Sequence, residues 1–364
     1  MTYQAGIIGT GGIAGMGILG LHEEEQISNE KFRASHAGGY HANERVKLVT
    51  ASDVDEDKLE RFGEAWDFPS AHRYASHREM LASEDLDIVS ICTSTLYHHR
   101  HVVDTVRSDA APDVVWCEKP IASSVTEANE TISACDEAGT ELVVNHSFRF
   151  TDKIQQLAEA IDDGLVGKVK SVTAQFRREL LRNSTHLIDT LVYLLDARAI
   201  TVYSYLNQEN DAVTTLEGGE DVNDVGGGGM VILEDGTMVL IDCTIAREYS
   251  SMNLQLLGTE GKLAINNDDG EWRYWTLRDG NHFKKPTPAT ESGWDWEIDY
   301  RAAFPNAVDH VVDVLEGEAD NLSPGRSALR SLEVIAGFFI SHYTGGRVSI
   351  PLDRPLEDVT VTSW

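Results

Sequence analysis

Short apolar segments alternate with amphipathic ones through the first 145 residues, and this alternation constrains the fold more than any other feature. The apolar segments end near residues 8, 52, 93, 118 and 145. Segments with helical spacing, such as 55–66 and 125–138, separate them. Strands and helices that alternate through short loops are typical of a doubly wound parallel sheet. We therefore expect an N-terminal α/β domain whose ligands bind at the carboxyl ends of its strands.

A glycine motif follows the first of these strands. The strand predicted at 4–8 leads directly into Gly9-Thr10-Gly11-Gly12-Ile13-Ala14, which fits the pattern G-x-G-x-x-G/A. The glycines allow a tight turn and a close backbone approach, and the N-terminus of a following helix offers N–H groups to a pyrophosphate. An overlapping match at 15–20 has no strand before it and is interpreted as helix and loop. The motif predicts dinucleotide binding by Gly9, Gly11, Gly12 and Ile13.

An acid ends the second predicted strand. Asp53 follows the apolar run 46–52, and a carboxylate there accepts hydrogen bonds from a ribose 2′-hydroxyl and repels a 2′-phosphate. Asp53 therefore favours NAD over NADP as the cofactor. The usual interval between glycines and acid is about twenty residues, whereas roughly forty separate them here.

The additional length lies between Leu21 and Arg45. We expect a solvent-exposed loop or a subunit contact. The alternative is a segment that folds over the cofactor cleft, which makes His36, Tyr40 and His41 candidates for contact with substrate. A metal pair of His36 and His41 has no acid or cysteine at ligand spacing, so no metal site is expected.

Two further strand ends carry polar residues. Trp116-Cys117-Glu118-Lys119-Pro120 places a lysine where open α/β sheets bind ligands, although a surface lysine in a strand-to-helix turn is the alternative. Thr93 and Ser94 end the preceding strand. In the run 98–101, adjacent histidines point in different directions on a helix, so only His98 is close enough to meet a cofactor.

The second half mixes helices with strands that are joined by hairpins. Helices are predicted at 152–162, 183–195, 300–315 and 326–341, and strands at 169–176, 229–233, 237–241 and 254–257. Hairpin turns imply an antiparallel or mixed sheet. Asn183, Ser184 and Thr185 are candidates to cap the second helix, where His186 and Asp189 share a face. We expect domains at 1–146 and 147–364.

Composition excludes several classes of partner. The chain has 60 acidic and 30 basic residues and a formal charge of −30, so its field repels nucleic acid. Acids dispersed along both halves suggest adaptation to high salt, with an acidic protein of ordinary habitat as the alternative. No apolar run is long enough for a membrane span and no signal peptide is evident, which predicts a cytoplasmic protein without a membrane partner. The four scattered cysteines predict free thiols.

Taken together, these motifs resemble the Gfo/Idh/MocA oxidoreductases, the glucose-fructose oxidoreductase and inositol dehydrogenase family. The resemblance covers nearly the whole chain and rests on the glycine motif, Ile91-Cys92-Thr93-Ser94-Thr95 with His98, Glu118-Lys119-Pro120, Arg149-Phe150 and His186-x-x-Asp189. It implies a Rossmann domain followed by an α+β domain whose large, mostly antiparallel open sheet forms a dimer or tetramer. It also implies a cis Lys119–Pro120 bond and cofactor contacts by Thr93, Ser94, His98, Glu118 and Pro120.

The resemblance further implies NAD-dependent oxidation or reduction of a secondary alcohol on a sugar or cyclitol. In the family, the residues that correspond to Lys119 and His186 meet the reacting hydroxyl. A neutral histidine titrates in the range suited to accept the hydroxyl proton, and a lysinium stabilises developing alkoxide charge. His186 is therefore assigned as the base and Lys119 as its electrostatic partner, or the two roles are exchanged. Asp189 would hold a substrate hydroxyl or orient His186.

One departure from the family pattern concerns charge. Many relatives carry an acid or Asn four residues before the histidine and Gly two before it, where this chain has Arg182 and Ser184. Substrate contacts are assigned to Arg149, Arg182 and Asn183, and an anionic substrate group is one interpretation of the basic cluster formed with Arg177 and Arg178. The alternative is that these arginines pair with carboxylates. Two other functions remain open: a glycosidase that uses NAD transiently and a non-catalytic dinucleotide-binding regulator.

Overall fold

The chain forms two compact units in the computed structural model, which describes residues 2–17, 34–207, 221–246, 248–249, 252–266, 270–279, 285–293 and 296–363. The N-terminal unit comprises residues 1–122, 127–151 and 298–328, and the C-terminal unit comprises 123–126, 152–297 and 329–364. None of the described helices is long and apolar enough to span a membrane.

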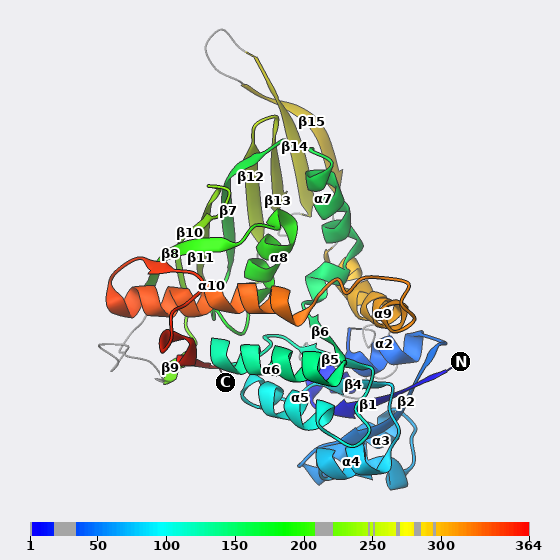
Figure 1. Cartoon of the computed structure of the whole chain (residues 1–364). Helices are drawn as coiled ribbons and strands as arrows, with labels where there is room; N and C mark the ends of the chain where they lie inside the picture. The colour runs from blue at the N-terminus through cyan, green and yellow to red at the C-terminus, as the bar shows by residue number, and fades with distance from the viewer. Residues whose placement is uncertain are drawn as a thin grey trace. The chain divides into compact units, whose positions relative to one another are not determined.

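A six-stranded parallel sheet forms the centre of the N-terminal unit (Figure 1). Its strand order is β3-β2-β1-β4-β5-β6, and the strands are β1 (Tyr3–Ile8), β2 (Val46–Ser52), β3 (Arg73–Tyr74), β4 (Ile88–Ile91), β5 (Val114–Glu118) and β6 (Glu141–Asn145). β5 is buried along its whole length, as expected for a strand covered on both faces, and its sequence is therefore apolar without alternation. The predicted doubly wound parallel sheet is confirmed.

Helical segments connect these strands and follow the last of them. They are η1 (Gly12–Met16), α2 (His36–Ala42), α3 (Glu56–Ala65), η3 (Ser70–His72), α4 (His77–Ser83), η4 (Thr95–Tyr97), α5 (His98–Val106), α6 (Val125–Ala138) and η5 (Ser147–Phe150). The helix expected after the glycine motif is a single turn, which ends at Gly17 and in which Gly15 departs from helical φ and ψ. Glycine has poor helix propensity, so three glycines in six residues limit this helix. Residues 18–33, which include part of the second glycine match, lie outside the described residues.

Helix α2 corrects the expectation of a solvent loop between Leu21 and Arg45, as far as that segment is described. The Ser35 hydroxyl accepts a hydrogen bond from Gly38 N at 3.0 Å and so caps the helix, and the first five helical residues are buried. A Cβ at Gly39 would lie 2.8 Å from Val308 Cγ2 and 2.9 Å from the Phe304 carbonyl oxygen. The glycine therefore permits close contact with the later helix α9. Periodicity could not reveal this helix because its buried face contains glycines and a histidine.

Helix α9 (Trp296–Leu315) belongs mainly to the N-terminal unit although it comes late in the chain. Phe304 and Val308 join Tyr40, Trp116 and Phe150 in one buried apolar cluster. The domain boundary expected after residue 146 remains a prediction, to which the structure adds the return of residues 298–328 to the first unit.

The C-terminal unit is built on a nine-stranded sheet in the order β15-β14-β13-β12-β7-β11-β10-β8-β16 (Figure 1). The strands are β7 (Val169–Arg177), β8 (Ala199–Leu206), β10 (Gly227–Leu233), β11 (Met238–Ile245), β12 (Asn253–Gly258), β13 (Gly261–Asn266), β14 (Glu271–Arg278), β15 (Lys285–Gly293) and β16 (Val348–Ser349). β7 and β11 run parallel, and the other described pairs run antiparallel. The predicted mixed, mostly antiparallel sheet is confirmed.

The remaining elements are α7 (Asp152–Asp162), α8 (Thr185–Leu195), α10 (Gly325–Thr344), η6 (Leu356–Asp358) and a small parallel sheet of β9 (Asp221–Asn223) and β17 (Thr360–Thr362). Helix α10 packs on β8, where a Cβ at Gly337 would lie 2.8 Å from Val202 Cγ2. Val202 is buried, whereas Tyr203 and Tyr205 are 48% and 74% exposed. This alternation shows that β8 has one face against a helix and one face open.

Candidate active site

The glycine loop after β1 has the shape that a dinucleotide requires. Gly9 has φ +91°, and a Cβ there would lie 2.8 Å from Thr93 Cγ2 and 2.9 Å from the Cys92 carbonyl carbon, so only glycine fits. At Gly11, by contrast, a Cβ would meet no other group of the described residues within 4 Å. A tight turn beside open space is what backbone contact with a pyrophosphate needs. The residues present therefore fit NAD, with Gly12 beginning η1 and Ile13 packed partly on the core.

The Asp53 carboxylate holds this loop from the end of β2. Its Oδ2 accepts hydrogen bonds from Thr10 N at 2.7 Å and Thr10 Oγ1 at 3.0 Å, and its Oδ1 accepts one from Asp55 N at 2.9 Å. Each carboxylate oxygen has two lone pairs, so the acid both fixes the loop and retains capacity for a ribose hydroxyl. Sequence reasoning located Asp53 but did not predict its contacts with Thr10.

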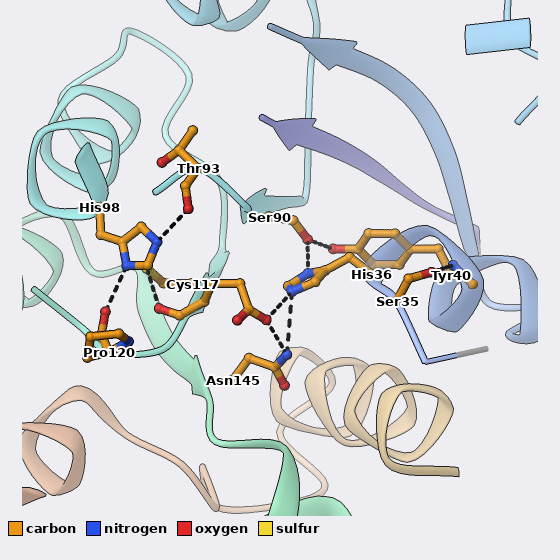
Figure 2. Close-up of polar contacts among 11 residues, drawn as sticks. Ser35, His36, Tyr40, Ser90, Thr93, His98, Cys117, Pro120 and Asn145 are labelled. Carbon is orange, nitrogen blue, oxygen red and sulfur yellow. Dashed lines mark hydrogen bonds and ion pairs between the residues drawn. The ribbon is translucent and has the colours of Figure 1, made fainter. Parts of the chain in front are cut away.

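His98 joins two strand ends. Its Nδ1 lies 2.7 Å from the Pro120 carbonyl oxygen and its Nε2 lies 3.0 Å from the Thr93 carbonyl oxygen (Figure 2). Burial lowers the pKa of His98, and a neutral ring donates to only one of these carbonyls. Because both ring nitrogens face backbone oxygens, the cofactor contact expected of His98 is not supported by its placement. Thr93 is half-buried, and Ser94 is exposed beside it.

Glu118, Lys119 and Pro120 end β5. Lys119 is partly exposed between two buried neighbours, and the Lys119–Pro120 bond is cis, as the resemblance implied. Glu118 Oε1 accepts hydrogen bonds from Asn145 Nδ2 at 2.5 Å and from His36 Nε2 at 3.0 Å. Burial raises the pKa of Glu118, but the His36 hydrogen bond and the charge of Lys119 outweigh it and hold that pKa below its usual value. The strand therefore ends in a buried carboxylate followed by an accessible lysine.

His36 and Tyr40 lie in the core, which corrects their assignment as candidates for contact with substrate. His36 is 0% exposed and its Nδ1 lies 2.9 Å from Ser90 Oγ, while the Tyr40 hydroxyl lies 2.6 Å from the same atom (Figure 2). His41 is exposed at the end of the same helix, so the two histidines do not form a pair. Two polar residues in apolar strands could have indicated this buried polar cluster from the sequence. They are Ser90 within β4 and Asn145 at the end of β6.

In the C-terminal unit, a turn between β7 and α8 positions His186. Asp224 Oδ1 and Oδ2 accept hydrogen bonds from Leu181 N at 3.0 Å and Arg182 N at 2.9 Å. Burial raises the Asp224 pKa to about 6. Sequence reasoning missed this residue, because it lies more than 40 positions from the turn that it holds.

The Asn183 side chain stabilises the same turn. Its Nδ2 donates to Glu179 Oε2 at 2.7 Å and to the Arg178 carbonyl oxygen at 3.1 Å, and Glu179 has a left-handed φ of +75°. Ser184 precedes α8 but donates its hydroxyl to the Arg177 carbonyl oxygen at 2.7 Å and makes no side-chain cap. The expected capping by these residues is therefore not found.

His186 and Asp189 lie in the first turns of α8. His186 is 9% exposed and Asp189 is 1% exposed. The Asp189 carboxylate accepts a hydrogen bond from Ser331 Oγ of α10 at 3.0 Å. Asp189 is thus fixed from a second helix of the same unit.

The four arginines of the predicted basic cluster differ in their surroundings. Arg149 is 2% exposed and donates to the Leu322 carbonyl oxygen at 3.0 Å and to Ser327 Oγ at 2.7 Å. These contacts give it a structural role in the N-terminal unit, so its placement does not support the expected substrate contact. Arg177 and Arg182 are half-buried and Arg178 is exposed. The four cysteines are buried and free, as predicted.

Comparison with known proteins identifies related chains. A model of the NAD-binding Rossmann domain of the Gfo/Idh/MocA oxidoreductase family matches residues 3–146, and a model of that family's C-terminal α/β domain matches residues 179–350. A D-apiose dehydrogenase of Paraburkholderia graminis is 26% identical over 353 residues, which cover 91% of each chain. A D-glucoside 3-dehydrogenase of Escherichia coli is 27% identical over 180 residues, which cover 44% of this chain and 48% of that one.

A solved structure has the same fold over nearly the whole chain. The WlbA dehydrogenase from Bordetella pertussis, in complex with NADH and UDP-GlcNAcA, superimposes with a TM-score of 0.72 and 20% sequence identity. The match covers 97% of this chain and 100% of that chain.

Proposed function

The chain belongs to the Gfo/Idh/MocA family of oxidoreductases, and we propose that it transfers a hydride between NAD and a secondary alcohol of a sugar or polyol. As a family member it is an oxidoreductase of CH–OH groups with an NAD-binding Rossmann domain. The observation that carries the proposal is the placement of Lys119, which is accessible at the end of a buried strand in the unit that contains the glycine loop.

NAD supplies the hydride acceptor when it is bound, and Gly9, Gly11, Asp53 and Glu118 would hold it. Glu118 Oε2 accepts no hydrogen bond within the described part of the chain, so it is available to a ligand hydroxyl. Asp53 favours NAD because a carboxylate repels the 2′-phosphate of NADP. The preference between NAD and NADP is measured by comparing kcat/KM for the two dinucleotides. A preference for NADP would contradict the role assigned to Asp53.

The remaining chemistry is assigned to three side chains. His186 accepts the hydroxyl proton as the C–H bond breaks, because a neutral imidazole has the proton affinity required near pH 7. Lys119 stabilises the developing alkoxide with its ammonium charge. Asp189 is fixed by Ser331 and orients His186 or binds a substrate hydroxyl.

The test is a panel of sugars, polyols and sugar acids, followed by NADH absorbance in high salt. Lys119→Met should lower kcat for every accepted alcohol by roughly a hundredfold or more, because it removes a charge aimed at the reacting oxygen. Lys58→Met is the matched control, since Lys58 is half-exposed and pairs with Asp55 at 3.2 Å on the surface. Unchanged turnover in Lys119→Met would refute the mechanism.

Two alternatives are separated by the same assay. A glycosidase that uses NAD transiently would release product without net NADH, and a dinucleotide-binding regulator would bind NAD and turn over no alcohol. The presence of both Lys119 and His186 supports the dehydrogenase, because a regulator needs only the cofactor pocket.

An anionic substrate is a finer proposal. Three arginines lie near the turn before His186: Arg177 and Arg182 are half-buried and Arg178 is exposed. An arginine guanidinium binds a carboxylate or phosphate group through two parallel hydrogen bonds. Arg182→Ala should raise KM for a sugar acid or sugar phosphate and leave KM for a neutral sugar unchanged. Equal KM values for charged and neutral sugars in this variant would remove the idea.

We also propose a homo-oligomer formed through the open face of the nine-stranded sheet. Tyr203, Tyr205, Leu240 and Leu257 are between 41% and 74% exposed, and exposed apolar patches are typical of subunit interfaces. Light scattering in molar salt measures the mass, and a monomer at all concentrations would contradict this.

A further inference from the structure

A buried chain of hydrogen bonds reaches Glu118 from the interior and has no role in the chemistry above. It runs from Tyr40 through Ser90 and His36 to the Glu118 carboxylate, with donor–acceptor distances of 2.6, 2.9 and 3.0 Å (Figure 2). Tyr40, Ser90 and His36 are 1%, 0% and 0% exposed. The chain ends in the core at Tyr40, so it offers no route for a proton to solvent.

The hydrogen-bond directions fix the state of His36. An ionised Glu118 only accepts, so His36 Nε2 must carry a proton. His36 Nδ1 then accepts from the Ser90 hydroxyl, which accepts from the Tyr40 hydroxyl, and every donor is paired. A doubly protonated ring would also donate from Nδ1 to the Ser90 hydroxyl oxygen, and one hydroxyl hydrogen, of Ser90 or of Tyr40, would then have no acceptor among the described residues, which is costly in a buried site. A neutral ring protonated at Nε2 is therefore the consistent state.

The Glu118 carboxylate is held by one of its two oxygens. Oε1 accepts both hydrogen bonds, from His36 and Asn145, whereas Oε2 accepts none within the described part of the chain. The His36 ring is itself fixed, because it lies against Trp116 with ring centroids 3.7 Å apart. The interior thus sets both the position and the orientation of the carboxylate.

We propose that His36 is a positioning residue for the active site, which holds Glu118 ionised and in one orientation beside Lys119. The proposal rests on the dehydrogenase function proposed for Lys119. The charge of Lys119 stabilises the ionised Glu118, and the same attraction draws the lysine toward a fixed carboxylate. Without His36, the buried Glu118 carboxylate would keep Asn145 as its one hydrogen-bond donor among the described residues.

Other titratable groups near Glu118 do not replace this effect. Glu118 acts electrostatically on Cys92, Cys117 and His98. Burial raises the pKa of both thiols and lowers the pKa of His98, so all three are neutral near pH 7. His36 and Lys119 are therefore the groups that determine whether Glu118 is charged.

The first test compares pH profiles of kcat and kcat/KM in three variants. His36→Phe keeps a ring on Trp116 and removes both hydrogen bonds, so kcat should fall roughly ten- to a hundredfold. Glu118 then binds a proton more readily, and the acid limb of the profile should move up by about one pH unit. His36→Gln retains a hydrogen-bond donor for Glu118 and should recover most of kcat. The acid limb of its pH profile should lie near the pH at which the wild-type limb lies.

His72→Phe is the matched control, because it also removes a histidine that contacts a glutamate, here Glu84 at 2.7 Å with the His72 side chain 44% exposed, and it should leave the profile unaltered. A rate loss in His36→Phe that is equal at every pH, and that His36→Gln does not relieve, would overturn the proposal. Such a result would show that His36 supports only the fold.

A second measurement needs neither turnover nor a folded His36→Phe protein. Histidine ¹⁵N chemical shifts in the wild type should show His36 as the Nε2–H tautomer at the pH of the activity assay, and Glu118→Gln should shift that signal. A ring protonated at Nδ1, or a signal unaffected by Glu118→Gln, would overturn the proposal. A wild type with the expected signal but no alcohol turnover would instead refute the proposed function and leave the His36–Glu118 contact with a structural role.

Discussion

The side chains assigned to catalysis are held in different ways in the two units. In the N-terminal unit, buried side chains connect the strand ends around Lys119: His98 lies between Pro120 and Thr93, and Asn145 and His36 hold Glu118. In the C-terminal unit, backbone N–H groups of the turn before His186 converge on the carboxylate of Asp224. The first arrangement depends on several contacts inside a core. The second combines the Asn183 and Ser184 side chains with the Asp224 carboxylate, whose pKa of about 6 makes the turn sensitive to pH.

The largest effect is expected from a substitution in the C-terminal unit that removes the proposed base without altering the turn that holds it. His186→Asn should lower kcat by roughly a hundredfold to ten-thousandfold, because a general base typically contributes this much. The variant should still bind NAD and melt at the wild-type temperature. Activity in NADH absorbance assays is the measurement, with His72→Asn as a surface control, since the His72 side chain is 44% exposed. If only Lys119→Met were inactive, the base would have to be sought in the N-terminal unit.

The N-terminal unit should be more sensitive to changes in its packing. Gly39→Ala places a Cβ within 2.9 Å of the Phe304 carbonyl oxygen, so α2 and α9 must separate at a cost of about 1–3 kcal/mol. Chemical denaturation measures this loss. Gly346→Ala in the C-terminal unit is the control, because a Cβ there would meet no group within 4 Å in the part of the chain that the structure describes, and it should change the unfolding free energy by less than about 0.5 kcal/mol. Equal losses in both variants would remove the contrast between the units.

The pH sensitivity of the C-terminal turn has a definite sign. The Asp224 pKa of about 6 in the folded chain exceeds its unfolded value of about 3.9, so the ionised carboxylate is disfavoured by folding. Asp224 therefore reduces stability progressively as the pH rises from about 4 to about 6, by roughly 3 kcal/mol in total. Asp224→Asn removes this dependence, so the stability of the variant relative to the wild type should increase over that range and then stay constant.

Asp235 provides the opposite control within the same unit. Its pKa is lowered, chiefly by the hydrogen bond from Thr237 N, so Asp235 stabilises the fold above its unfolded pKa and loses that contribution as the pH falls. Melting temperatures of Asp235→Asn should therefore approach those of the wild type at acid pH. If the stabilities of Asp224→Asn and Asp235→Asn relative to the wild type changed with pH in the same way, the opposite pKa shifts assigned to the two carboxylates would be contradicted.

The smallest effect concerns surface charge in the N-terminal unit. Arg45 lies 2.9 Å from Asp313 and 3.0 Å from Glu316, with a third acid, Asp309, at 3.6 Å. Arg45→Ala should destabilise the protein by about 0.5–1 kcal/mol at low salt, because like charges then face one another. Molar salt should abolish this difference by screening.

Adaptation to high salt also predicts that the melting temperature of the wild type rises with salt concentration. A melting temperature that stays constant would favour an acidic protein of ordinary habitat.

Sequence reasoning succeeded where the signal was local. Strand ends at Asp53, Thr93 and Glu118 were predicted from apolar runs, because each run is contiguous and ends in a polar residue. The hydrogen bond between His36 and Glu118 joins residues 82 positions apart, and no periodic pattern records such a pair. Asp224 was missed for the same reason, since its partners lie 42 and 43 positions away. The helix α2 was hidden because glycine, which favours loops, is required there by the proximity of α9.

The late return of residues 298–328 to the N-terminal unit has a consequence for biosynthesis. A nascent chain that has just completed β6 has its six parallel strands but lacks Phe304, Val308 and the neighbouring apolar residues that cover Tyr40 and Trp116. That surface stays open while the ribosome translates β7 to β15 of the large sheet, which precede residues 298–328 in the chain. The N-terminal unit of this protein therefore completes its core only after residues 298–328 have been made, and a gene fragment that stops at residue 146 would encode a domain without Phe304 and Val308 of that cluster.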